Sequence, residues 1–196
     1  MANSSPAVAE NDDREAKRLE ELYSLGLLDT LSDLRFDQYT QLAAEIFGVP
    51  IAMISLIDAE RQWIKSAHGV PVFESPRAVS FCTHAVEADE DLVVENALED
   101  ARFARNPTVA GDHHIRFYAG GVIRGPNGYA LGTCCVIDRE PREFAERDRR
   151  VLHQITRMVD YEIESRALMR SLRESVGQVD QPEWHKHLDV LINGRV

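Results

Sequence analysis

The sequence lacks the apolar run of about 18 residues that a membrane-spanning helix needs. Its longest apolar stretch, Val49–Ile57, is short and is interrupted by proline and serine. Residues 1–30 carry several acidic side chains and have no basic segment followed by an apolar one. We therefore expect neither a membrane span nor a secretory signal, and we expect a cytoplasmic protein.

Cysteine is scarce, with only Cys82, Cys134 and Cys135 in 196 residues. They form no CxxC pair and no zinc-finger spacing. The two adjacent cysteines would point to opposite faces of a strand. These features argue against a disulfide framework and a structural zinc site, and they fit reduced thiols.

Basic residues are the minority, because 22 Lys and Arg stand against 33 Asp and Glu, for a net charge of -11. A chain of this charge repels polyanions, so we do not expect a nucleic acid partner. The acidic stretch Glu87–Asp100, which has no basic residue, is most simply a solvated surface loop.

Hydrophobic periodicity divides the chain into helices, then strands, then a helix. Residues 1–13 are expected to be disordered. Helical stripes follow in Arg14–Leu25 and Leu34–Phe47, and a helix of about 30 residues begins near Glu143. Between them, strand patterns are predicted at Val49–Asp58, Arg61–Ala67, Leu92–Glu95, Ile115–Ile123 and Tyr129–Asp138.

This order predicts an α+β domain with an antiparallel sheet and helices on one side. The turn Gly125–Gly128 is the clearest hairpin signal, whereas Ser80–Val86 is ambiguous between helix and strand. The long terminal helix has an apolar stripe that so small a domain cannot cover. A homodimer through the terminal helices is the simplest consequence.

Several ordered motifs resemble the GAF domain, and more narrowly the GAF subfamily of bacterial sensor histidine kinases and diguanylate cyclases. The resemblance covers residues 14–166 and leaves 167–196 as a helical extension and tail. It rests on LGLLDT (25–30), FDQYTQLAAEIFGVPIAMISLID (36–58), RQWIKS (61–66), SFCTHAV (80–86), DARFARNPTVAGDHHIRFYAG (100–120) and GYALGTCCVIDREPR (128–142).

The resemblance implies a GAF/PAS-like antiparallel sheet of five or six strands, with the N- and C-terminal helices packed on one face and a ligand pocket under loops on the other. It also implies dimers through those helices and a separate histidine kinase or cyclase as effector. The cyclic-nucleotide signature and the bilin-anchoring Cys-His pair of other GAF domains are absent. The resemblance therefore leaves the ligand and any cofactor unknown.

Cys82 and His84 are the first candidate ligand-binding pair. They share one face if Ser80–Val86 is extended, but they diverge by about 200° if it is helical. A thiol beside an imidazole could be reactive, whereas a small buried cysteine is the ordinary alternative. Cys134 would join them in a redox pair if it faced the pocket.

A second candidate group flanks the predicted hairpin. On an extended chain Arg116 and Tyr118 share one face, where a guanidinium and a phenol would suit a small anionic or aromatic ligand. The alternative is a structural salt bridge from Arg116 to Asp100 or Asp112. The group also includes Arg102, Phe103 and Asn106. Adjacent histidines at 113 and 114 point apart, so no metal site is predicted.

These observations predict a non-catalytic sensory module that binds a small ligand and signals through the terminal helices of a dimer. The sequence has no convincing catalytic constellation, so an enzyme is the less favoured reading. Two alternatives stay open. One is a thiol-based redox sensor or reductase that uses Cys82 with Cys134, and the other is an interaction scaffold with no ligand.

Overall fold

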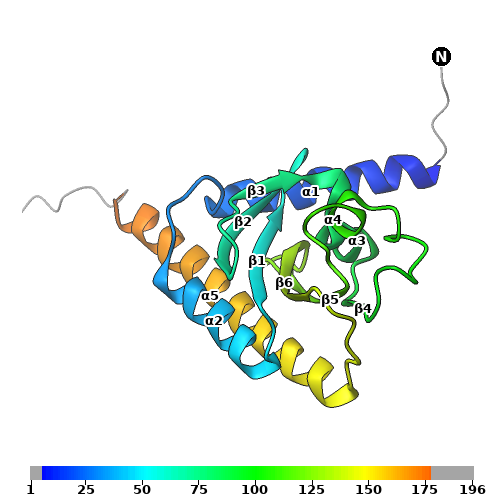
Figure 1. The fold of residues 1–196 in the computed structure, drawn as a ribbon. Coiled ribbons are helices and arrows are strands. Elements are labelled where there is room, and N and C mark those ends of the chain that lie inside the picture. The colour runs from blue at the N-terminus through cyan, green and yellow to red at the C-terminus, as the bar shows by residue number, and fades with distance from the viewer. Residues whose placement is uncertain (1–5, 178–196) are drawn as a thin grey trace, which may run out of the picture.

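A six-stranded antiparallel sheet divides the molecule into two layers (Figure 1). The computed structural model describes residues 6–177. The strands run in the order β3-β2-β1-β6-β5-β4, and every neighbouring pair is antiparallel. Their bounds are β1 Ile51–Ile57, β2 Arg61–His68, β3 Glu74–Pro76, β4 Leu92–Val94, β5 Phe117–Arg124 and β6 Ala130–Asp138. The predicted α+β architecture is confirmed.

Three long helices cover one face of the sheet: α1 (Pro6–Leu25), α2 (Leu34–Phe47) and α5 (Glu146–Gly177). Figure 1 shows α2 beside α5, while α1 passes along the end of the sheet toward α3. Leu22, Phe36 and Ile163 of these helices are fully buried in one core with the sheet. Within residues 6–177, no helix combines the length and apolar character needed to cross a membrane.

Short elements cover the opposite face. They are the 3-10 turn η1 (Arg77–Val79), helix α3 (Phe81–Ala88) and the single-turn α4 (Pro107–Ala110). A second buried cluster lies beneath them, where the Phe81 ring stacks on Phe103 at 4.1 Å and on Tyr118 at 5.1 Å between centroids.

Element boundaries differ from the sequence-based prediction at the N-terminus and between residues 69 and 86. Helix α1 begins at Pro6, so residues 6–13 are helical rather than disordered. Ser80–Val86 resolves as helix because the Ser80 side chain accepts the Thr83 backbone N–H as an N-cap. A short strand, β3, lies within the expected loop Gly69–Arg77. The further helix expected at Glu183–Ile192 lies outside the described residues.

The long helix α5 lies close against strand β5 at Gly121. A Cβ atom added there would stand 2.2 Å from Thr156 Oγ1 and 3.1 Å from Thr156 Cβ. The Thr156 hydroxyl already donates to the Leu152 carbonyl of its own helix, and the side chain is buried. The absent side chain therefore sets how closely the C-terminal helix approaches the sheet.

We predict that Gly121→Ala destabilises the domain by about 1–3 kcal/mol, because helix α5 must move away from the sheet. Removing the opposing side chain in the double variant Gly121→Ala/Thr156→Ala should recover part of that loss. Urea unfolding of both single variants and the double variant measures the coupling. Additive losses would show that the close contact does not limit the packing.

Candidate functional site

A cavity of about 90 Å³ lies between the short helices and the sheet. Its walls come from β1, β2, β5 and β6 on the sheet side and from η1, α3 and the loop around α4 on the other side. None of its lining residues is Asp, Glu, Lys, Arg or His. They are Met53, Gln62, Ile64, Val72, Ser75, Val79, Ser80, Phe81, Cys82, Thr108, Ile115, Tyr118 and Ile137.

The predicted residues Cys82 and Tyr118 meet at this cavity. Tyr118 is fully buried, and its hydroxyl lies 3.4 Å from both Cys82 Sγ and Thr133 Oγ1. Burial raises the pKa of Tyr118 well above 10.0, so the phenol stays protonated as a donor. Gly120 makes room for it, since a Cβ there would lie 2.2 Å from the phenol oxygen.

His84 does not share a face with Cys82, because both lie within one helical turn of α3. Its side chain is exposed, and its ring meets the edge of Phe103 at 4.8 Å. The helical outcome thus removes the thiol–imidazole pair that an extended segment would have made. Phe103 itself is fully buried behind the cavity and packs on Phe81.

Cys134 lies on the wrong face of β6 for the predicted partnership with Cys82. Its side chain is part of the core beneath the long helices, and burial raises its pKa to about 12. The adjacent Cys135 occupies the position beside Cys82 that had been considered for Cys134, with its Sγ 3.9 Å from Cys82 Sγ. Strand parity places one cysteine on each face, as the sequence predicted, and the structure puts Cys135 rather than Cys134 on the cavity side.

The other predicted residues hold the loops that roof the cavity. Asn106 caps α4 through the Thr108 backbone N–H and donates to the Val79 carbonyl at 2.9 Å. Arg116 donates to the Val109 carbonyl at 2.8 Å. This contact holds the loop in place of the salt bridge to Asp100 or Asp112 that the sequence offered as an alternative.

Arg102 instead forms the ion pair with Asp100, at 2.6 Å. Its guanidinium also lies over the ring of Phe103, with the central carbon 5.1 Å from the centroid. Arg102 and Arg116 are both absent from the cavity lining. The structure thus gives neither guanidinium the ligand-facing position that the alternating pattern had suggested.

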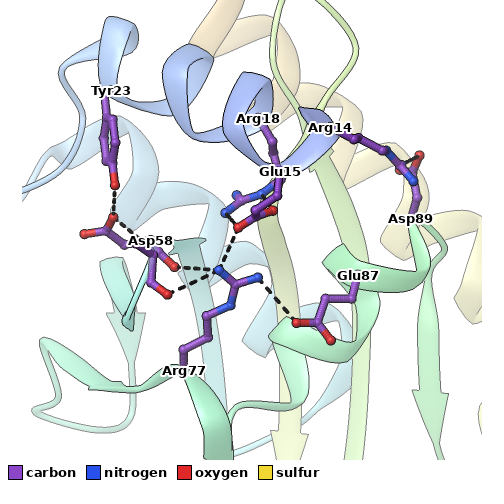
Figure 2. Close-up of polar contacts among 9 residues, drawn as sticks. Arg14, Glu15, Arg18, Tyr23, Asp58, Arg77, Glu87 and Asp89 are labelled. Atoms are coloured by element: carbon purple, nitrogen blue, oxygen red, sulfur yellow. Dashed lines mark hydrogen bonds and ion pairs between the residues drawn. The ribbon is translucent and has the colours of Figure 1, made fainter. Parts of the chain in front are cut away.

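Sequence reasoning missed Arg77, which joins the cavity roof to the N-terminal helix (Figure 2). Its guanidinium donates to Glu15 Oε1 of α1 at 2.7 Å and to the Asp58 carbonyl at 3.2 Å. It also reaches Glu87 of α3 at 3.4 Å. The Arg77 carbonyl in turn accepts the Thr83 hydroxyl at 3.0 Å. No local motif marks this arginine, because its partners are distant in sequence.

Glu15 accepts hydrogen bonds from two arginines, since Arg18 also donates to both of its carboxylate oxygens. Partial burial alone raises the pKa of Glu15, but the hydrogen bonds from Arg18 and Arg77 outweigh it and hold the pKa below 4.5. Arg14 adds a further ion pair from α1 to Asp89, the C-cap of α3. The terminal helix is therefore tied to the cavity side through polar contacts.

A family model described as the GAF domain matches residues 33–163, more than half of the chain. The chain is also 40% identical over 159 residues to a cyclic di-GMP phosphodiesterase of Pseudomonas aeruginosa. That match covers 81% of this chain and 26% of the phosphodiesterase. The chain thus spans about a quarter of the length of the curated relative it matches.

Two solved structures show the same fold at low identity. The GAF domain of an Acinetobacter phosphoenolpyruvate-protein phosphotransferase has a TM-score of 0.57 at 18% identity, covering 92% of this chain and 100% of that chain. A free methionine-R-sulfoxide reductase of Neisseria meningitidis, solved with its substrate, has a TM-score of 0.58 at 13% identity, covering 87% and 97%.

We predict that Glu15→Gln makes the stability less dependent on acid. The pKa of Glu15 is lower in the folded state than its ordinary value, so its contribution is present at neutral pH and is lost as the pH falls through the folded pKa. Between about pH 5 and pH 3 the free energy of unfolding of the variant should fall by on the order of 0.5–1 kcal/mol less than that of the parent. The difference is small because water screens this partly exposed carboxylate.

Urea unfolding at several pH values tests this, with Glu20→Gln as the matched control. Glu20 is exposed on the same helix and forms no ion pair within the described part of the chain. Equal acid sensitivity in the Glu15 variant and the parent would contradict the prediction.

Proposed function

The chain belongs to the GAF domain family, and from that premise we propose that it is a non-catalytic regulatory domain of a cytoplasmic signalling system. It binds a small molecule in the cavity beside Tyr118 and passes the change to its terminal helices. The connection through Arg77 carries the proposal, because one residue contacts both parts: its guanidinium donates to Glu15 of helix α1, and its backbone carbonyl accepts the Thr83 hydroxyl of the cavity roof.

The cavity limits the ligand by size and charge. About 90 Å³ is well below the roughly 300–1,000 Å³ of sites that take drug-sized ligands. The lining offers amide and hydroxyl groups from Gln62, Ser75 and Ser80 among apolar walls. We infer an uncharged ligand of a few heavy atoms, in place of the anionic ligand that the arginines first suggested.

The route to the output helices runs through α1. Val79, the last residue of η1, and Phe81, the first residue of α3, border the cavity, and Arg77 is the first residue of η1. A shift of this turn displaces the Arg77–Glu15 contact and with it α1. Helix α1 in turn meets α5, where Arg170 donates to the Ser24 carbonyl at 3.0 Å. A change at the cavity is thereby passed to both terminal helices.

A cyclic di-GMP enzyme is the effector that the comparisons favour. The relative that is 40% identical bears the name of a cyclic di-GMP phosphodiesterase, and the chain matches a quarter of it. The proposal is therefore that this domain regulates an effector that makes or degrades cyclic di-GMP. The scaffold alternative requires a cavity filled by side chains, and the open space at Tyr118 speaks against it.

We predict that neutral molecules of a few heavy atoms raise the melting temperature of the domain. At one hundred times Kd the gain is about 2.7 kcal/mol, or about 5–10 °C for a domain of this size. The measurement is a thermal-shift screen, preceded by native mass spectrometry and an absorption spectrum of freshly purified protein. Ile115→Trp should remove the shift, because Ile115 is a half-buried residue of the cavity wall.

The matched control is Leu98→Trp, an exposed apolar position that is absent from the cavity lining. Its response to each compound should equal that of the parent protein. If compounds shift the parent and Ile115→Trp equally, they bind elsewhere and the cavity is not the ligand site.

The dimer is proposed through α5. Met158, Tyr161, Leu168 and Leu172 recur at heptad spacing on this helix and are between 43% and 61% exposed. A second copy of the same stripe would cover them, as two-fold symmetry requires.

We predict that Leu168→Glu/Leu172→Glu converts a dimer into a monomer at micromolar concentration, because paired carboxylates would face each other in the seam. Light scattering coupled to size-exclusion chromatography measures the mass. Arg173→Glu changes the net charge by the same amount on another face of α5 and should stay dimeric. A monomeric parent protein across this concentration range would overturn the helix-coupled mechanism.

A further inference from the structure

Two cysteines from distant parts of the chain meet in the core beside the cavity. Cys82 comes from the first turn of α3 and Cys135 from the central strand β6. Their Sγ atoms are 3.9 Å apart, and both residues are buried. A disulfide has an S–S bond of about 2.05 Å, so rotation of one side chain has to bring the sulfurs together by about 2 Å.

The groups around Cys82 favour its thiolate. It is the second residue of α3, where free backbone N–H groups and the helix dipole stabilise negative charge. The Tyr118 hydroxyl donates to its sulfur at 3.4 Å. Burial raises the pKa of Cys82, but the hydrogen bonds from Cys135, Ser55, Thr133 and Tyr118 lower it by more, so the pKa lies below the usual 9.0.

The two thiols have different surroundings. Cys82 lines the cavity, and Cys135 does not. The interaction with Cys82, together with burial, raises the pKa of Cys135 well above 9.0. A small reagent that enters the cavity therefore reaches Cys82 first, and Cys82 is the better nucleophile of the pair.

We propose that Cys82 and Cys135 form a reversible disulfide when the domain meets a hydroperoxide, so that this half of the domain is an oxidant-responsive thiol switch. The inference goes beyond the proposed function and stands without it, because it needs no ligand and no effector. It also differs from the pair Cys82 and Cys134 suggested by the sequence, since Cys134 lies in the opposite core.

The chemistry takes two steps. The Cys82 thiolate attacks one peroxide oxygen, the O–O bond breaks, and an alkoxide or hydroxide leaves and takes a proton, which leaves a sulfenic acid on Cys82. The Cys135 sulfur then attacks the Cys82 sulfur, the S–O bond breaks, and water leaves. The two thiols together lose two electrons and two protons, the hydroperoxide is reduced, and an added dithiol reverses the oxidation.

The bond would act on the same turn that communicates with α1. Thr83 follows Cys82 directly and donates its hydroxyl to the Arg77 carbonyl. A disulfide would fix the first turn of α3 to β6, the strand buried at the centre of the sheet. Oxidation and ligand binding would thus affect one structural element from two directions.

The test treats the folded protein with increasing hydrogen peroxide and maps its disulfides by mass spectrometry without reduction. Trypsin leaves Cys82 in the peptide 78–102 but puts Cys134 and Cys135 together in 125–139. The Cys134→Ser variant removes that ambiguity and is also the matched control. It should lose two hydrogen atoms from its intact mass, link the two peptides, and regain its mass with dithiothreitol.

Cys135→Ser should instead stop at the Cys82 sulfenic acid, which dimedone traps as a stable adduct. Cys82→Ser should show neither the linkage nor the adduct. Circular dichroism melting checks that each variant is folded, and the linkage in the parent protein and in Cys134→Ser decides the matter if a Cys82 or Cys135 variant is not. Retention of both thiols at peroxide levels that oxidise the methionines would overturn the proposal, as would a linkage that needs Cys134.

Discussion

The structure depends on a central strand, β6, that is buried on both faces. All nine of its residues are buried, and it pairs with β1 on one side and β5 on the other. Its alternating side chains must therefore fill two separate cores, one beneath the long helices and one beneath the short elements. Because the side-chain period of a strand is two, a slip of one residue would exchange these cores, so the register is strongly specified.

This constraint explains why the two faces carry different roles. The helical face is closed by extensive apolar packing and by the close approach of α5 at Gly121. The other face is covered only by short segments held by caps and loop contacts, such as Asn106 to the Val79 carbonyl. Segments with few packed neighbours open at low free energy, and binding sites are drawn from such regions. The cavity and the Cys82–Cys135 pair both lie on this face, which is consistent with that division.

The sequence predicted the architecture well, because period and turn chemistry are local signals. Most elements were predicted from the helical stripes, the Gly125–Gly128 turn and the alternating strand patterns. The ordered set of motifs indicated the GAF family. The side of the sheet taken by each cysteine could not be predicted, because all nine residues of β6 are buried and the strand has no alternation of polar and apolar residues to mark its two faces. Tyr118 was placed correctly as cavity-facing, whereas Cys134 was not.

The role of Arg77 could not be predicted from local sequence patterns, for a different reason. The central strands β1 and β6 are buried along their whole length, so a polar connection between the two layers passes around the edge or the end of the sheet. Helix α1 passes along the end at the β1–β2 turn, where the Asp58 carbonyl accepts Arg77 and the Asp58 carboxylate accepts Tyr23 (Figure 2). The guanidinium spans this gap because it offers five donors in a fixed plane. A lysine has the charge but not the geometry to hold α1, the turn and α3 together, so the contact between the cavity roof and helix α1 depends on the shape of this one side chain as much as on its charge.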